Sequence, residues 1–143
     1  MYVDSKDKEL DSGQILGIFL KNNPQPQPDN VVMPAILAEL SQPNCKVQQI
    51  GNTLFEVHTG QNGQGFFKAF NVDIPPNFVD NSKQFVVWAR RVLNLKVLVT
   101  EFDDPQLAQL FKIIAMRPPL PGMGYQMYKS QSGKTRIVLN LGA

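Results

Sequence analysis

A strand with apolar residues on both faces most constrains the fold of this chain. Residues 96–102 (KVLVTEF) are β-branched and almost continuously apolar in their first half, which is typical of a strand at the centre of a sheet. Residues 81–93 before it predict a helix, and residues 66–73 predict an earlier strand. A helix that joins two strands of one sheet makes them parallel. We therefore expect these two strands to be parallel neighbours. The helical stripe consists of Phe85, Trp88, Ala89, Val92 and Leu93.

The remaining segments complete the pattern of an α/β domain. One helix is predicted at 11–21, and a second follows Asp29 or Asn30 as its N-cap. From Lys46 the apolar period changes to two, which indicates a three-strand meander, and a helix after Asp104-Pro105 and a C-terminal hairpin follow the central strand. We expect one domain over residues 1–143, with a mixed, mostly antiparallel sheet and helices packed on both faces. Its irregular segments are an N-terminal arm at 1–10 and a Pro-rich loop at 22–30.

Several classes of site are disfavoured by composition. Cys45 is the only cysteine and His58 the only histidine, so the chain lacks the residues for an internal disulfide, a zinc finger or a Ser-His-Asp triad. From the sequence we expect no Cys/His cluster and no metal. The N-terminus is charged and no apolar run approaches about 18 residues, so we expect no membrane association and a cytoplasmic protein.

Charge is unevenly distributed along the chain. The net charge is +2, but residues 83–143 hold nine of the fourteen basic side chains. On the helix at 81–93, Lys83, Arg90 and Arg91 are predicted to share one solvent-facing side. This face is a candidate site for an anionic partner, and ordinary solvated charge is the alternative.

The order of these elements resembles the GNAT family of acyl-CoA-dependent N-acyltransferases, over about residues 11–141. Members of that family carry a strand that ends in a proline-containing segment, an aromatic residue and a Gly-rich loop that opens a helix. Here the corresponding segments are residues 72–78 (VDIPPNF) and 79–84 (VDNSKQ), which keep the strand and the aromatic but not the glycines. A second family segment corresponds to Asp104, Leu107, Leu110-Phe111 and Ala115-Met116, and the family's first strand would fall at Tyr2-Val3.

The resemblance implies a site for the acyl donor and marks where that site departs from the family. Glycines in such a loop let backbone N–H groups reach a pyrophosphate at a helix N-terminus. Asp80, the expected N-cap, would instead place a carboxylate there. By position, the residues that the resemblance assigns to acyl-CoA are Val72, Ile74, Asn81, Ser82, Lys83, Asp104 and Phe111.

Catalytic residues are also assigned by the resemblance. The family returns a proton to the leaving thiolate from a tyrosine, and Phe111 takes that place. Tyr125 and Tyr128 are candidates to replace it, and Glu56 is a candidate base for an amine. Cys45 is expected to be a buried or inert thiol.

Three functions remain open from the sequence. The first is a divergent acyltransferase-fold protein that binds acetyl-CoA or another acyl-CoA weakly or not at all, with weak or lost catalysis. The second is a non-catalytic binding or assembly module of the same fold. If the module is phage-encoded, a virion is the alternative location. The third is a nucleic-acid-binding domain that uses the basic C-terminal half.

Overall fold

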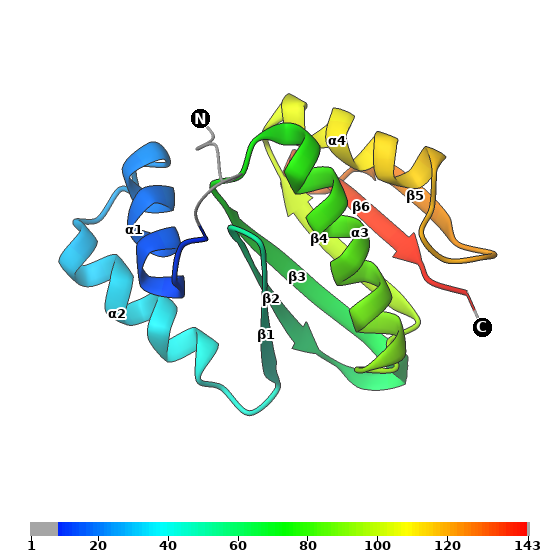
Figure 1. Cartoon of the computed structure of the whole chain (residues 1–143), viewed down its shortest axis with the longest axis horizontal. Helices are drawn as coiled ribbons and strands as arrows, with labels where there is room; N and C mark the ends of the chain where they lie inside the picture. Colours follow the sequence, from blue (N-terminus) through cyan, green and yellow to red (C-terminus); the bar gives the residue numbers. More distant parts are fainter. Residues whose placement is uncertain (1–8, 143) are drawn as a thin grey trace.

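Six strands form one mixed sheet in the computed structural model, which describes residues 9–142. The strand order is β1-β2-β3-β4-β6-β5, and Figure 1 shows the helices above and beside this sheet. In chain order the elements are α1 (Ser12–Asn22), α2 (Asp29–Leu40), β1 (Cys45–Ile50), β2 (Thr53–Thr59), the 3-10 turn η1 (Gln61–Gly63), β3 (Gln64–Asn71), α3 (Pro75–Arg91), β4 (Val97–Phe102), α4 (Pro105–Met116), β5 (Gly124–Lys129) and β6 (Thr135–Asn140).

The meander and the parallel pair were both predicted, and both are confirmed. Strands β1, β2 and β3 pair antiparallel, and Gly51 adopts a φ of +59° at the turn between β1 and β2. Strand β3 then pairs parallel with β4. Gly65 on β3 leaves room for neighbouring side chains, because a Cβ there would lie 2.8 Å from both Val57 Cγ2 of β2 and Leu95 Cδ1, just before β4.

The parallel pairing is short, and this shapes the molecule. Only Gln64–Phe66 pairs with Val97–Val99. Beyond that point β3 continues beside β2, while β4 continues beside β6. The sheet therefore opens between its third and fourth strands in the direction of their C-terminal ends, as Figure 1 shows.

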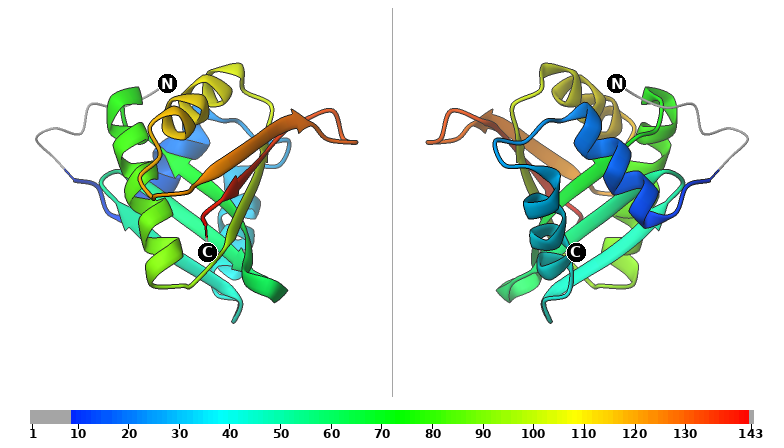
Figure 2. Two further views of the ribbon diagram at one scale, coloured as in Figure 1. Left: turned by 90° about the vertical axis from the view of Figure 1, so that its right-hand side faces the viewer. Right: turned by 90° about the vertical axis from the view of Figure 1, so that its left-hand side faces the viewer.

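Each face of the sheet has its own apolar core, which confirms that helices pack on both faces. Alternate side chains of a strand point to opposite faces, so Phe55 and Val57 of β2 face α3 and α4, whereas Leu54 faces α1 and α2. Figure 2 shows the two helix pairs on opposite sides of the strands. On the α1 and α2 side the buried residues are Leu10, Ile15, Leu16, Leu54, Phe70 and Val72.

The N-caps expected from the sequence mark the start of α1 and α4 but not of α2. Asp11 and Asp104 cap α1 and α4 as expected, through hydrogen bonds from the N–H groups of Gln14 and Gln106. The expected cap of the second helix is wrong, since Pro28 precedes α2 and makes no side-chain cap bond. Val92, placed in the core stripe of α3, is the C-cap and is 66% exposed.

The largest correction concerns the start of α3. We expected a loop up to Asp80 and a helix from residue 81, but α3 begins at Pro75 and Ile74 is its N-cap. Proline suits the first turn of a helix because its missing N–H has no partner to lose there and its φ is already helical. Asp80 is therefore not a cap, and it lies exposed in the second turn of α3.

Two further expectations concern the chain ends and the surface. Most of the arm at 1–10, including the strand expected at Tyr2-Val3, lies outside the described residues. No helix between residues 9 and 142 is long and apolar enough to cross a membrane.

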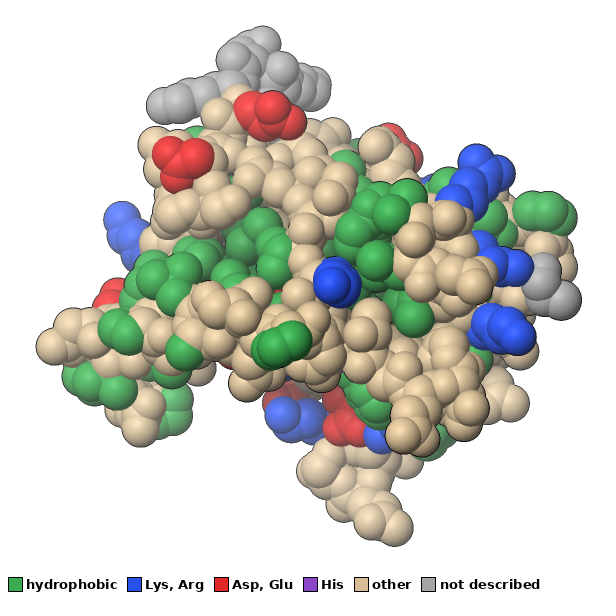
Figure 3. All heavy atoms as spheres, turned by 90° about the horizontal axis from the view of Figure 1, so that it is seen from below, with side chains coloured by type: hydrophobic (Ala, Val, Ile, Leu, Met, Phe, Trp, Pro, Cys, Tyr) green, Lys and Arg blue, Asp and Glu red, His purple; other side chains and the backbone are tan. Residues whose placement is uncertain are grey.

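In the face seen in Figure 3, Lys and Arg side chains gather toward the end of the molecule that carries β5 and β6.

Candidate functional site: a cleft between β3 and β4

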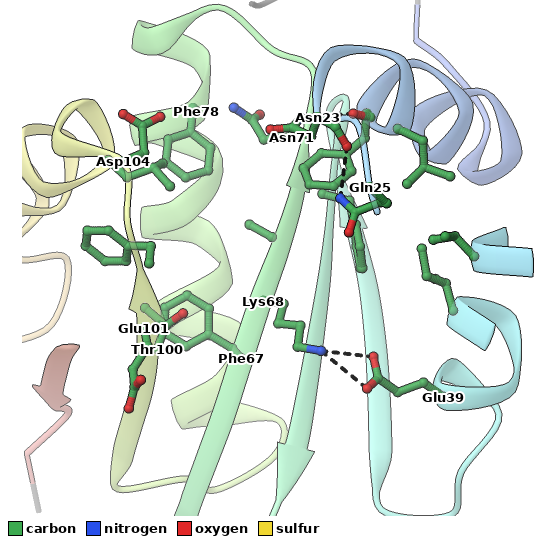
Figure 4. Close-up of a pocket in the computed structure, with 18 of the residues that line it drawn as sticks. Asn23, Gln25, Glu39, Phe67, Lys68, Asn71, Phe78, Thr100, Glu101 and Asp104 are labelled. Carbon is green, nitrogen blue, oxygen red and sulfur yellow. Dashed lines mark hydrogen bonds and ion pairs between the residues drawn. The ribbon is translucent and has the colours of Figure 1, made fainter. Parts of the chain in front are cut away.

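A cleft of about 420 Å³ lies where β3 and β4 separate. Its walls are the C-terminal parts of these two strands, with α1, α2 and the loop between them on one side. Phe78 of α3 and the start of α4 close the other side, as the close-up in Figure 4 shows. The cleft thus follows directly from the short parallel pairing.

Main-chain groups form part of its walls. Residues 67–71 of β3 and residues 100–102 of β4 each pair with a strand on one side only, β2 and β6 respectively. Neither segment pairs with the other. A bound chain that is extended and carries amide groups can hydrogen-bond to such strand edges in the manner of an added strand.

Aromatic rings line the apolar end of the cleft. Phe111 packs at centroid distances of 5.4 Å from Phe102, 6.0 Å from Phe67 and 6.1 Å from Phe78. All four rings belong to the cleft lining, and Phe111 is only 4% exposed. This wall suits an apolar group such as an acyl chain and offers no proton donor.

Charged side chains line the opposite wall. Lys68 Nζ lies 3.2 Å from Glu39 Oε2, and Figure 4 shows this pair spanning from β3 to α2. Glu39 is partly buried, which opposes ionisation, but hydrogen bonds with Glu56 and with Lys68 hold its pKa below the ordinary value. The ion pair closes the cleft on the α2 side.

Glu56 lies behind this pair and is fully buried. Its Oε2 lies 2.6 Å from His58 Nε2 and 3.7 Å from Cys45 Sγ. Burial and the hydrogen bond with Glu39 raise its pKa. Burial and the neighbouring Glu56 carboxyl likewise raise the pKa of the Cys45 thiol to about 11, as an inert thiol requires. The expectation that the chain has no Cys/His cluster is wrong, because the β1–β2 register places Cys45 opposite His58.

The N-terminus of α3, where a pyrophosphate would bind in the resembled family, is occupied by the chain itself. Pro75 and Pro76 supply no N–H groups to its first turn. The carboxylate of Asp73, 1% exposed, lies at this end and accepts hydrogen bonds from Asn52 N at 3.0 Å and Asn81 Nδ2 at 2.5 Å. A buried carboxylate at a helix N-terminus takes the place of an external anion. The residues at this point do not fit a diphosphate.

The residues assigned to an acyl donor by resemblance are divided among the cleft, the core beneath α1 and α2, and helix α3. Asp104 and Phe111 line the cleft. Val72 is fully buried in the α1 and α2 core, and Ile74 is the N-cap of α3. The others lie farther along α3, so no loop presents them. Asn81 and Ser82 are buried there, and half-exposed Lys83 borders a shallow hollow beside Pro119.

The candidate catalytic residues are also separated. Tyr125 and Tyr128 are exposed on β5, at the far edge of the sheet and two strands away from β4, and neither lines the cleft. Glu56 lies on β2 and does not line the cleft itself, but its neighbours Glu39 and Lys68 do.

Sequence reasoning missed the residues that define the cleft. Lys68 and Glu39 belong to no motif in the sequence, although the register of β2 with β3 pairs Glu56 with Lys68 and so places an acid and a base side by side. Alternation within residues 66–71 was the available signal for a strand with Phe67 and Ala69 on one face. It did not indicate that this strand would part from β4 after three residues.

Comparison with known proteins supports the fold. No family model and no curated protein sequence matches the chain. Among solved structures, N-acetyltransferase PseH of Campylobacter jejuni matches with a TM-score of 0.64 and 9% identity, over 94% of each chain. Spermidine N-acetyltransferase of Vibrio cholerae, in complex with CoA and spermine, matches with a TM-score of 0.59 and 11% identity, over 94% of this chain and 93% of that one.

A further match is the ribosomal-protein-S18-alanine N-acetyltransferase of Escherichia coli, with a TM-score of 0.53 and 9% identity over 95% of this chain and 93% of that one. The PseH fold was also solved in complex with acetyl coenzyme A, and that structure matches with a TM-score of 0.59 at 12% identity. Likeness at this level of identity concerns the fold. The chain has the fold of the GNAT N-acetyltransferases.

Proposed function

We propose that this protein is a divergent N-acyltransferase-fold protein that binds the acyl-pantetheine part of an acyl donor in the cleft between β3 and β4 and transfers the acyl group slowly. The observation that carries the proposal is the separation of β3 from β4 after Phe66 and Val99, which leaves two strand edges facing a cleft of about 420 Å³.

Chemical fit supports binding of the pantetheine arm. That arm is extended and contains two amides, so it matches strand edges that have no strand partner on the cleft side. The acyl end matches the aromatic wall around Phe111, where apolar groups leave water. Thr100 and Asn71 also line the cleft, and their polar side chains would select among ligands by hydrogen bonding to the amides of the arm.

The nucleotide end of CoA has no matching site at α3. Pro75 and Pro76 remove two N–H donors, and Asp73 supplies a negative charge where the diphosphate would lie. We therefore expect acetyl-CoA to bind no better than a pantetheine thioester. Contacts with the diphosphate would otherwise raise the affinity for acetyl-CoA tenfold or more, which corresponds to about 1.4 kcal/mol of binding free energy.

Slow transfer follows from the groups available in the cleft. The departing thiolate needs a proton, and no tyrosine, cysteine or histidine is among the described residues that line the cleft. The ammonium group of Lys68 does line it, but it is held in the ion pair with Glu39. The tyrosines of β5 lie at the other edge of the sheet.

Calorimetry with two ligands tests the proposal. Acetyl-CoA and S-acetyl-pantetheine should bind with affinities that agree within about threefold, which is well below the tenfold that 1.4 kcal/mol represents. In Ala69→Phe the added ring fills the cleft and should abolish binding of both. Ala38→Phe adds the same ring at an exposed site of α2 outside the cleft and should leave binding unchanged. Equal binding by the two variants would overturn the proposal.

A non-catalytic module is the second candidate, and the same strand edges favour it. An extended peptide can occupy the cleft by main-chain hydrogen bonding without any thioester. Binding of neither thioester by the unaltered protein, together with binding of an extended peptide that Ala69→Phe abolishes, would favour this function over acyl-donor binding.

A further inference from the structure

The hairpin of β1 and β2 brings three side chains with metal-binding atoms to one face of the sheet. Cys45 and His58 are directly opposite each other in the register, and Glu56 lies two residues before His58 on the same face. Opposite residues of an antiparallel pair have Cβ atoms about 5 Å apart, and residues i and i+2 of a strand share a face. The ligand atoms of all three residues lie within 4.8 Å of one another.

We propose that Cys45 Sγ, the Glu56 carboxylate and His58 Nε2 form a binding site for one divalent transition-metal ion of the zinc class. A thiolate, an imidazole and a carboxylate are each ligands that Zn²⁺ binds, and three protein ligands leave a fourth position for water in a tetrahedral site. The side chain of His58 is 22% exposed, so that fourth position is reachable from solvent. No ligand comes from the acyl-donor cleft, so the site is independent of the proposed function.

Glu56 supplies a second observation that points to a ligand. The side chain is 0% exposed, and its Oε1 receives no hydrogen bond from any donor in the described part of the chain. Its other neighbour is the carboxyl group of Glu39, which can hydrogen-bond to it only when the two carboxyl groups share a proton. The oxygen that lies beside the other two ligands is Oε2, and a cation bound to this carboxylate would offset the cost of burying its charge.

The local charge balance also fits a divalent ion. One thiolate and one carboxylate neutralise an ion of charge +2, and the neutral imidazole adds none. The ion pair between Lys68 and Glu39 stays intact beside this neutral site. Binding breaks the S–H bond of Cys45 and releases its proton to solvent, together with the proton that Glu56 shares with Glu39, while the sulfur and the Glu56 carboxylate donate electron pairs to the metal.

Cobalt substitution tests the site without relying on a variant. Protein freed of metal by a chelator is titrated with Co²⁺. Because Cys45 is the only cysteine, a thiolate-to-cobalt charge-transfer band must report this residue. We expect the band to saturate at one ion per chain and to disappear on addition of one equivalent of Zn²⁺. No saturable band would overturn the proposal.

Variants then separate the three ligands from the fold. We expect Cys45→Ser to abolish the charge-transfer band, and His58→Gln to weaken Zn²⁺ affinity, measured by competition with a chromophoric chelator, by about tenfold or more. Asp103→Asn removes an exposed carboxylate after β4 and should leave both unchanged. Zn²⁺ should raise the melting temperature of the unaltered protein but not that of Cys45→Ser. Unchanged Zn²⁺ affinity in both ligand variants, with native circular dichroism, would overturn the site.

Discussion

Asp73 and Asn81 are joined by a buried hydrogen bond of 2.5 Å from Asn81 Nδ2 to Asp73 Oδ2. Asp73 follows β3, and Asn81 lies on the inner face of α3, so the bond fixes this helix against the end of the strand. Asn81 Nδ2 also lies 3.2 Å from Thr53 Oγ1, at the start of β2. One amide thus connects three elements, and the carboxylate it binds is the one that occupies the N-terminal end of α3.

Asn81→Ala should destabilise the protein by about 2 kcal/mol, because the buried Asp73 carboxylate loses a donor. Urea unfolding followed by circular dichroism measures the change. Gln84→Ala, on the exposed side of the same helix, should shift the unfolding free energy by less than about 0.5 kcal/mol. Similar small shifts in both variants would contradict a stabilising role for this bond.

Gly51→Ala should cost more stability than Gly133→Ala, although both glycines have positive φ values, of +59° and +84°. The backbone strain of about 1–2 kcal/mol is common to both variants. At Gly51 the new Cβ would also lie 3.0 Å from Asn81 Nδ2 and 3.1 Å from Asp73 Oδ2, whereas nothing lies within 4 Å at Gly133. We expect an additional cost of about 1 kcal/mol, measured by thermal unfolding. Equal losses of stability in the two variants would show that Asn81 and Asp73 make room for the new Cβ at no cost in free energy.

Phe111→Tyr should raise the rate of acyl transfer to an amine by about tenfold or more, since it places a proton donor in the cleft beside the proposed thioester site. Release of free thiol from acetyl-CoA in the presence of a primary amine gives the rate. Phe111→Leu is the matched control, because it changes the ring without adding a hydroxyl. Equal rates in the two variants would show that a donor at this position does not limit transfer.

Arg91→Glu tests the cationic face of α3. Arg91 is exposed, while Lys83 and Arg90 are half-buried and the Arg90 guanidinium donates to Asn94 Oδ1 at 3.0 Å. If this face binds an anionic partner, the affinity of the protein for a fluorescent oligonucleotide should fall steeply as the salt concentration rises. Arg91→Glu should weaken that affinity further. Loss of a positive charge in the last turn of α3 should also cost about 0.5 kcal/mol of stability. A stability loss with unchanged affinity would leave Arg91 with that helical role alone.

Local sequence determined most of the elements. The apolar stripe of α4 and the caps Asp11 and Asp104 were readable because caps and stripes depend on neighbouring residues. The parallel pairing of β3 with β4 was readable because a helix between two strands permits little else. The expected start of α3 was wrong because Pro75-Pro76 suggests a loop and Asp80 suggests an N-cap. Proline is also favourable in the first turn of a helix, and α3 begins there.

Tertiary structure alone decided the sites. Where β3 leaves β4, and therefore where the cleft opens, depends on how α1 and α2 pack on one face and α3 and α4 on the other. The approach of Cys45 to His58 depends on the register of a hairpin, in which a shift of one residue would turn each side chain to the other face. Such contacts join residues distant in sequence, and their free energy comes from burial and pairing in the assembled fold, which no local period encodes.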